Sequence, residues 1–294
     1  MKVCAVIVTY NREKLLLECL DALARQTVPV KQVVLIDNAS TDGTAQAIQA
    51  VLASSRYPFK LIYQRLAVNT GGAGGFYEGV KRATLAGEFS DWLWLMDDDA
   101  EPSPTCLEKL LAAPGLEQYG FLAPRIIHKE SGREEAYHQK IKMDLFRIKE
   151  IQKPAGLMAT SLEANAFVGV LINTKAVAKV GLPDPSYFIW FDDADYTYRI
   201  SRFFKPGVFV SDAVIFHKDQ IFQKNSDNWK HVFGLRNRIR FYKKFAPPLG
   251  ILMLSAKAFK HIAVFLAKGQ AYAARTLMAE LFWGDREIEI RRLK

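Results

Sequence analysis

Residues 92–102 read WLWLMDDDAEP, in which five apolar residues precede three aspartates. A short apolar run of this kind is typical of a buried strand, and ligands bind at the carboxyl ends of strands in open α/β sheets. We therefore expect Asp97, Asp98 and Asp99 at a ligand-binding edge of a sheet. Because side chains alternate along a strand, Asp97 and Asp99 are expected to point the same way.

The flanking sequence alternates strand and helix patterns, as in an α/β domain with a mostly parallel sheet. Strands are predicted at residues 3–9, 32–37, 60–65 and 91–96, and helices at 12–25, 43–54 and 75–86, the second of them capped by residues 40–42. Further strands are predicted at 120–127, 166–172 and 207–216, and a further helix at 193–204. Residues 128–160 show no pattern that assigns an element.

The composition excludes several classes of protein. Half of the 294 residues are hydrophobic and 24% are charged, so the chain is globular and neither disordered nor collagen-like. The three cysteines form no CxxC pair, which argues against a disulfide framework or a thiolate metal site and favours a reducing cytosol. The N-terminus has the pattern of a first strand and not of a signal sequence.

No uninterrupted apolar stretch reaches the roughly 18 residues that a membrane-spanning helix needs. The longest candidate, residues 247–267, is broken by Lys257, Lys260 and His261. We therefore expect no membrane-spanning helix.

The excess positive charge lies in the last third of the chain. Residues 214–294 hold 16 Lys and Arg against 6 Asp and Glu, whereas residues 1–213 hold 24 against 25. Helical patterns follow residue 228, so we expect an α/β domain over 1–227 and a helical region over 228–294. The mixture of apolar and basic residues suits helices that lie on an anionic membrane surface. Association into a homo-oligomer and a solvated helix face are the alternatives.

The acidic run can hold a metal. Asp97 and Asp99 offer hard carboxylate oxygens, which suit Mg²⁺ or Mn²⁺, and such a site commonly holds a cation bridged to a diphosphate. His217 follows the predicted strand 207–216 and can complete the shell. The alternatives are an acidic turn that caps the next helix and a histidine that merely ends a strand.

A glycine cluster follows the third predicted strand in NTGGAGGFYEGV, residues 69–80. The backbone amides of Gly71 and Gly72 at a helix N-terminus suit an anion or a polar ligand. A flexible loop is the alternative.

A second acidic motif occurs in YFIWFDDADYTYRI, residues 187–200. Asp192 and Asp193 begin a predicted helix, where acidic side chains interact favourably with the helix dipole. They can instead supply a general base beside an aromatic wall for a sugar acceptor, formed by Trp190 and Phe191.

The motifs together resemble the inverting glycosyltransferases of family 2, which have the GT-A fold, a Rossmann-like, mostly parallel sheet flanked by helices. The resemblance spans residues 1–245 and rests on VTYNR (8–12), LIDNASTDGT (35–44), LMDDD (95–99), FDDADYTYR (191–199) and His217. Within the family, NTGGAGGF and FDDADY are most similar to galactofuranosyltransferases and next to bacterial rhamnosyltransferases. Phe191 and Asp195 depart from the usual acidic motif, which has Trp and Glu there.

The resemblance implies roles for individual residues. The nucleoside would be held by Thr9, Tyr10, Asp37 and Asn38, and the rest of the donor would face Arg65, Asn69, Gly71, Gly72 and Asp98. A divalent cation, Mn²⁺ or Mg²⁺, would be bound by Asp97, Asp99 and His217. Asp193 would be the catalytic base, with Asp192 beside it.

The resemblance also implies a reaction. A nucleotide diphosphate sugar, a UDP-sugar first and a dTDP-sugar next, would donate galactofuranose or rhamnose to a bacterial surface glycan linked to polyprenyl diphosphate, with inversion. The enzyme would be cytoplasmic and peripheral on the inner face of the membrane.

Two other classes of function stay open on the sequence. A nucleic-acid-binding protein would explain the basic region but not the acidic motifs at strand ends, so we expect no nucleic-acid partner. A glycoside hydrolase also uses paired carboxylates.

Overall fold

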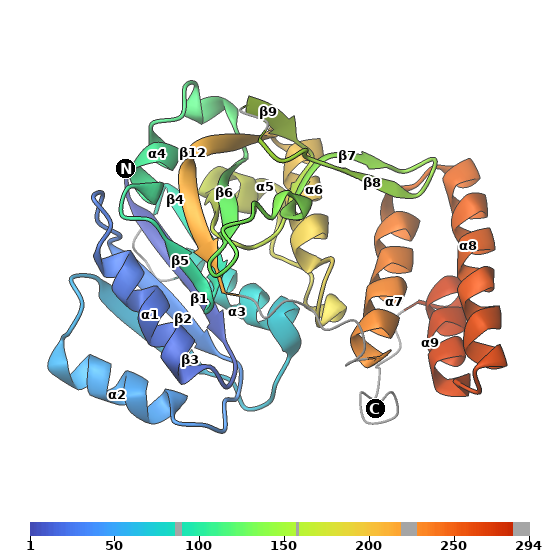
Figure 1. The fold of residues 1–294 in the computed structure, drawn as a ribbon, viewed down its shortest axis with the longest axis horizontal. Helices are drawn as coiled ribbons and strands as arrows, with labels where there is room; N and C mark the ends of the chain where they lie inside the picture. Colours follow the sequence, from blue (N-terminus) through green and yellow to red (C-terminus); the bar gives the residue numbers. More distant parts are fainter. Residues whose placement is uncertain (86–89, 157–158, 219–227, 285–294) are drawn as a thin grey trace.

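The computed structural model describes residues 1–85, 90–156, 159–218 and 228–284, and its centre is a mixed, mostly parallel sheet (Figure 1). The strand order is β3-β2-β1-β4-β11-β6-β12-β5, and β9 pairs with β12. The strands are β1 (Val3–Thr9), β2 (Gln32–Asp37), β3 (Lys60–Arg65), β4 (Trp92–Asp97), β5 (Ala100–Pro102), β6 (Phe121–His128), β9 (Ala159–Leu162), β11 (Val170–Asn173) and β12 (Gly207–His217). β3, β2, β1 and β4 run parallel, so their carboxyl ends meet at one edge.

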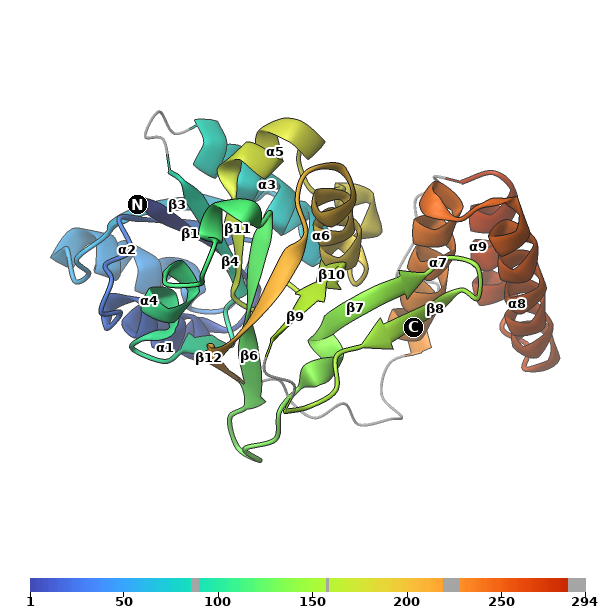
Figure 2. The ribbon, with the colours of Figure 1, turned by 90° about the horizontal axis from the view of Figure 1, so that it is seen from above.

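Helices cover both faces of this sheet (Figure 2). One face carries α1 (Glu13–Ala24), α2 (Thr44–Ser54) and α4 (Cys106–Leu111), and the other carries α3 (Gly71–Leu85), α5 (Thr174–Val180) and α6 (Asp192–Phe203). β1 shows how the sequence builds both cores, because Val3, Ala5 and Ile7 pack on the first face and Cys4, Val6 and Val8 on the second. The three-layer α/β architecture confirms the predicted fold class.

Residues 128–160, which the sequence patterns did not assign, form much of a second, small sheet. It consists of β10 (Ala164–Asn165), β7 (Gln139–Asp144) and β8 (Lys149–Gln152). Short 3₁₀ turns are η1 (Leu116–Gln118), η2 (Ala136–His138) and η3 (Pro185–Tyr187). The β7–β8 hairpin reaches toward α7, where Arg238 pairs with Glu150 at 2.6 Å (Figure 2).

The C-terminal region is helical, as expected. It contains α7 (Asn228–Phe245), α8 (Pro248–Ala267) and α9 (Ala271–Phe282), separated at Pro247–Pro248 and at Gly269, whose φ is 71°. These helices share a hydrophobic core with Met143 of β7, Ala164 of β10 and Tyr198 of α6. They therefore pack directly against the elements that surround the second acidic motif.

Three expectations need correction. α3 begins at Gly71 and not near residue 75, so the glycine cluster lies within the first turns of the helix. The strand expected at 166–172 is limited to Val170–Asn173. α2 starts after Gly43 without a side-chain cap, although Asp42 Oδ1 accepts from Thr44 N at 3.0 Å.

The helix α8 bears on the expectation of no membrane-spanning helix, which stays a prediction. By length and composition alone α8 is long and apolar enough to cross a membrane. Length and composition do not distinguish a spanning helix from a helix packed on a protein or lying on a surface.

Candidate active site

The acidic end of β4 is buried and held by residues from β1 and the segment after it. Asp98 and Asp99 are 3% and 4% exposed. Asp98 Oδ2 accepts a hydrogen bond from Thr9 Oγ1 at 2.7 Å. Arg12 Nη1 lies 3.2 Å from Asp98 Oδ1 and 2.6 Å from Asp99 Oδ2. Burial outweighs these contacts for Asp98 and raises its pKa to about 6.

His217 is brought to the same place because β12 pairs with β5, the short strand that follows the acidic run. Its Nε2 lies 3.4 Å from Asp99 Oδ1, and its Nδ1 lies 2.7 Å from Glu135 Oε2. Burial by itself would lower the pKa of His217, but the two carboxylates raise it to about 10. The imidazolium thus partly neutralises a group of buried carboxylates.

This group of side chains fits a divalent cation. Asp99 Oδ1 is buried and accepts no hydrogen bond from the residues that the structure describes. Asp97, crowded by the carboxylates of Asp99 and Asp98, has a pKa well above its ordinary value, chiefly because it is buried. A cation that replaces the proton on His217 would give Asp99 Oδ1 a partner and would lower the pKa of Asp97. Carboxylate oxygens and neutral imidazole are suitable ligands for Mn²⁺ or Mg²⁺. Among the described residues, the three side chains whose ligand atoms all lie within 4.8 Å of one another are Glu135, His138 and His217, so His217 belongs to a second possible set of metal ligands.

The carboxyl ends of β1 and β2 form a second polar cluster beside the first. Asp37 is fully buried and accepts from Tyr63 Oη at 2.8 Å and from Ser40 N at 2.7 Å. Arg65, half exposed, donates to Ser40 O at 2.6 Å. Tyr10 is 43% exposed, whereas Thr9 is buried. The residues expected to hold a nucleoside therefore lie along one sheet edge; their binding role stays a prediction.

The glycine cluster is tied to this edge by asparagines. Asn38 donates to Gly71 O at 2.8 Å and accepts from Thr70 N at 2.8 Å, and Asn69 Oδ1 accepts from Gly71 N at 2.8 Å. Gly71 has φ +72°, and a Cβ there would lie 2.0 Å from Phe188 O, so only glycine fits. A Cβ on Gly72 would meet nothing within 4 Å. The space at Gly72 is compatible with a ligand.

Asp192 and Asp193 begin α6, as the sequence predicts. Asp193 Oδ1 accepts from Ala194 N at 2.6 Å. Burial raises the pKa of Asp193 to about 6, although that amide and the ammonium of Lys140 oppose the shift. Burial raises the pKa of Asp192 further, together with the charges of Asp193 and Asp97. The charge of Asp97, in the first acidic motif, thus contributes to the raised pKa of Asp192 in the second.

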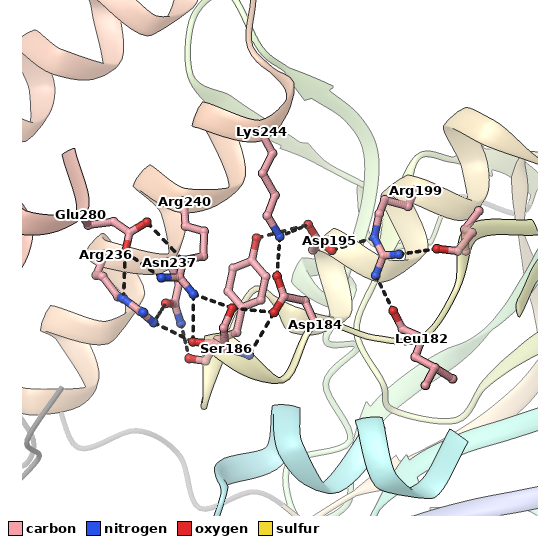
Figure 3. Close-up of polar contacts among 12 residues, drawn as sticks. Leu182, Asp184, Ser186, Asp195, Arg199, Arg236, Asn237, Arg240, Lys244 and Glu280 are labelled. Carbon is pink, nitrogen blue, oxygen red and sulfur yellow. Dashed lines mark hydrogen bonds and ion pairs between the residues drawn. The ribbon is translucent and has the colours of Figure 1, made fainter. Parts of the chain in front are cut away.

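The segment before α6 is fixed by α7 (Figure 3). Trp190 is 36% exposed and packs over Gly234, where a Cβ would lie 2.9 Å from the Trp190 ring. The Phe191 ring packs on Phe241, with ring centroids 5.9 Å apart. Phe191 therefore contributes to the core shared with the C-terminal helices, and an acceptor role for the two aromatic residues stays a prediction.

Four residues of this site had no predicted role. Arg12 lies in the motif VTYNR, which the sequence analysis identified. Its contacts with Asp98 and Asp99 could not be predicted from that motif. Glu135 and His138 lie in the unassigned segment 128–160. Asn237 is an isolated asparagine in a basic helix, and no local pattern marks it.

Comparisons with known proteins bear on the family and the fold of the chain. The family model "Glycosyl transferase family 2" matches residues 4–168. Galactofuranosyltransferase GlfT1 of Mycolicibacterium smegmatis is 29% identical over 205 residues, which cover 68% of this chain and 65% of that protein. The N-acetylglucosaminyl-diphospho-decaprenol L-rhamnosyltransferase of Mycobacterium tuberculosis is 26% identical over 251 residues, covering 72% and 74%. The chain thus spans about two thirds of the galactofuranosyltransferase's length.

Solved structures resemble the fold at low sequence identity. Staphylococcus aureus TarS 1–349 in complex with UDP-GlcNAc matches 96% of this chain and 82% of its own at a TM-score of 0.61 and 15% identity. The mannosyltransferase PcManGT of Pyrobaculum calidifontis, in complex with GDP-Man and Mn²⁺, matches 97% and 88% at a TM-score of 0.59 and 15% identity. These likenesses bear on the fold alone, which is the expected GT-A type. Because the family model covers more than half of the sequence, the chain belongs to glycosyl transferase family 2 and is an enzyme of that family.

Proposed function

We propose that the chain is an inverting, metal-dependent glycosyltransferase that uses a nucleotide diphosphate sugar. The observation that carries the proposal lies at the carboxyl end of β4, where Asp97 ends the strand and the buried side chains of Asp99 and His217 lie 3.4 Å apart, at the same sheet edge as Asp37 and Asn38. A divalent cation bound there would stabilise the charge that develops on the departing nucleotide diphosphate.

The chain's own residues supply the rest of the reaction. Asp37 and Asn38 orient the nucleoside, and Arg65 faces the donor. Asp193 accepts the proton of the acceptor hydroxyl as that oxygen attacks the anomeric carbon and the bond to the diphosphate breaks. A single displacement with the base opposite the leaving group inverts the anomeric centre.

Galactofuranose from a UDP-sugar is the first candidate for the transferred group, and rhamnose from a dTDP-sugar is the second. The order follows the relatives, because a galactofuranosyltransferase is 29% identical to the chain and a rhamnosyltransferase is 26% identical. The acceptor is a glycan on polyprenyl diphosphate in a bacterial surface polysaccharide. The name of the rhamnosyltransferase, which includes a diphospho-decaprenol, supports a lipid-linked acceptor.

A panel of nucleotide sugars tests the reaction. With Mn²⁺ and a lipid-linked acceptor, UDP-galactofuranose should be consumed and UDP released, and EDTA should stop the release. Turnover of dTDP-rhamnose alone would reassign the sugar. Hydrolysis of glycans without any nucleotide donor would replace the proposal with a glycoside hydrolase.

The proposed location is the inner face of the cell membrane, reached through α8. Leu252, Phe259 and Leu266 follow one another at seven-residue spacing and are 67%, 48% and 53% exposed, so they form one apolar stripe on the helix. Lys260 and Lys268 are exposed along the same helix and its end. Within residues 228–284, the described part of the helical region, the one acidic residue is Glu280, which is buried.

This charge distribution favours an anionic membrane over a second copy of the chain. Two copies joined through the stripe would bring like charges together, whereas anionic headgroups attract them, by about 1 kcal/mol for each Lys or Arg near the surface. Phe282 and Trp283 are 57% and 71% exposed, and aromatic side chains are common at membrane interfaces.

Vesicle sedimentation tests the location. The protein should sediment with phosphatidylglycerol vesicles, less with phosphatidylcholine vesicles and less at high salt. Leu252→Glu should abolish sedimentation, and Leu85→Glu, at a 70% exposed leucine on α3, should not. Equal sedimentation of both variants would contradict the proposal, and a dimer that Leu252→Glu dissociates would assign the stripe to self-association.

A further inference from the structure

The backbone directly before the proposed base is strained. Phe188, Trp190 and Phe191 have φ angles of 63°, 65° and 71°. Bulky residues rarely adopt positive φ, because the side chain then crowds the backbone. Three of them within four residues persist only where the surrounding structure holds the turn in place.

Asn237 of α7 holds this turn in place through hydrogen bonds. Its side chain is fully buried. The two N–H groups of its Nδ2 are shared among three backbone carbonyls of the turn, Tyr187 O at 2.8 Å, Ile189 O at 2.6 Å and Trp190 O at 3.0 Å. A single amide group therefore fixes the carbonyl directions on both sides of Phe188 and at Trp190.

Two arginines and a glutamate hold Asn237 and the start of the turn in position (Figure 3). Arg236 donates to Asn237 Oδ1 and to Ser186 O, both at 2.9 Å, and Arg240 donates to Ser186 O at 3.1 Å. Glu280 of α9 is buried and pairs with both arginines, at 3.2 Å and 3.0 Å. The network thus links two C-terminal helices to the segment that enters α6.

The opposite side of the turn contacts the glycine cluster. Ala73 N of α3 donates to Phe188 O at 3.1 Å. The turn consequently lies between the C-terminal helices and the helix that carries Gly71 and Gly72, and its last residue, Phe191, directly precedes Asp192.

From this arrangement we infer that Asn237 is a positioning residue for catalysis: it holds the turn 187–191 so that Trp190 and Asp193 face the acceptor. The inference rests on the proposed role of Asp193 as the base. The C-terminal helices then support the catalytic site in addition to carrying the proposed membrane-binding stripe.

Kinetics of matched variants test the inference. Asn237→Ala removes the amide, so kcat for sugar transfer should fall roughly 10- to 100-fold, because a small misplacement of a reacting group is costly. Affinity for UDP with Mn²⁺, measured by calorimetry, should stay unchanged, since its proposed ligands lie on other elements. Val232→Ala on the same helix removes buried methyl groups but none of the hydrogen bonds between Asn237 and the turn, and should keep kcat. Equal losses of kcat in both variants would reduce Asn237 to a structural residue.

A spectroscopic measurement keeps the test independent of turnover. With 5-fluorotryptophan incorporated, the ¹⁹F resonance of Trp190, assigned through Trp190→Phe, should shift or split in Asn237→Ala and stay in place in Val232→Ala. If Asn237→Ala does not fold, Asn237→Ser, whose hydroxyl is too short to reach the carbonyls, takes its place. An unmoved Trp190 resonance overturns the inference. A moved resonance in a chain that transfers no sugar from any donor would instead reject the proposed function.

Discussion

His217 and Glu135 are separated by 82 residues in sequence and meet through a hydrogen bond of 2.7 Å between Nδ1 and Oε2. The bond fixes the orientation of the imidazole and leaves its Nε2 facing Asp99. Carboxylates that accept from the second nitrogen of a metal-binding histidine orient the ring and increase its basicity. Glu135 thus has the position of a residue that tunes the proposed metal site.

Replacement of Glu135 by glutamine should therefore weaken metal binding. Glu135→Gln should lower the affinity for Mn²⁺ about 10- to 100-fold, the range for such partners of a ligand. Calorimetry or electron paramagnetic resonance of Mn²⁺ measures the change, and Asp99→Ala should abolish binding. Glu134→Gln is the matched control, because Glu134 pairs with Lys153 at 2.7 Å instead. Equal affinities of Glu135→Gln and Glu134→Gln would exclude the role of Glu135.

Asp193→Asn should remove the base and keep the shape of the site. Turnover should fall roughly 10²- to 10⁴-fold while donor affinity changes little. Asp192→Asn should lower turnover less than Asp193→Asn does, because the family resemblance assigns the base to the second aspartate of the pair. Steady-state kinetics with both variants measure the difference, and near-normal turnover of Asp193→Asn would move the role to a neighbouring carboxylate.

Turnover should decrease in acid. Burial raises the pKa of Asp193 to about 6, and a base must be deprotonated, so the rate should be level above about pH 6 and fall with each pH unit below it. Asp98 also has a pKa of about 6, again because of burial. The pH profile of residual turnover in Asp193→Asn separates the two, since the acidic limb should disappear if Asp193 is its source and persist if Asp98 is.

Loss of Glu280 should destabilise the protein. Its carboxylate pairs with Arg236 and Arg240, and all three side chains are about 95% buried. Removal of one partner from a buried ion pair leaves uncompensated charge, so Glu280→Ala should lower the free energy of unfolding by about 3–5 kcal/mol. Urea denaturation measures it, with Glu108→Ala at an exposed site of α4 as the control. Equal stability of the two variants would show that the network contributes little.

The sequence was sufficient to predict the bounds of the elements that have a clear apolar pattern. β1, β2, β3 and β4 lie within one residue of their predicted bounds, because each is a short run that is buried or half-buried, apart from the exposed end residues of β3. α3 starts at Gly71 and not near residue 75, since Gly75 and Gly79 pack closely on Val8 and Val6 of β1 and the glycine cluster forms the first turns of the helix instead of preceding it.

The contacts that complete the site were beyond prediction because they depend on long-range packing. Lys140 and Lys142 of β7 alternate with apolar residues too briefly to assign a strand, so Glu135 beside it had no place in the fold. Asn237 acts on backbone carbonyls about 50 residues earlier in the chain, and backbone groups carry no signal in the sequence. Motifs at strand ends could be found; their partners on distant elements could not.

The anomeric configuration of the product tests the account most directly. Wild-type protein is incubated with UDP-galactofuranose, Mn²⁺ and a lipid-linked acceptor, and the new glycosidic linkage is examined by NMR spectroscopy. The account predicts transfer only in the presence of a divalent cation, with the anomeric configuration opposite to that of the donor. Transfer with retained configuration, or full transfer in EDTA, would contradict it.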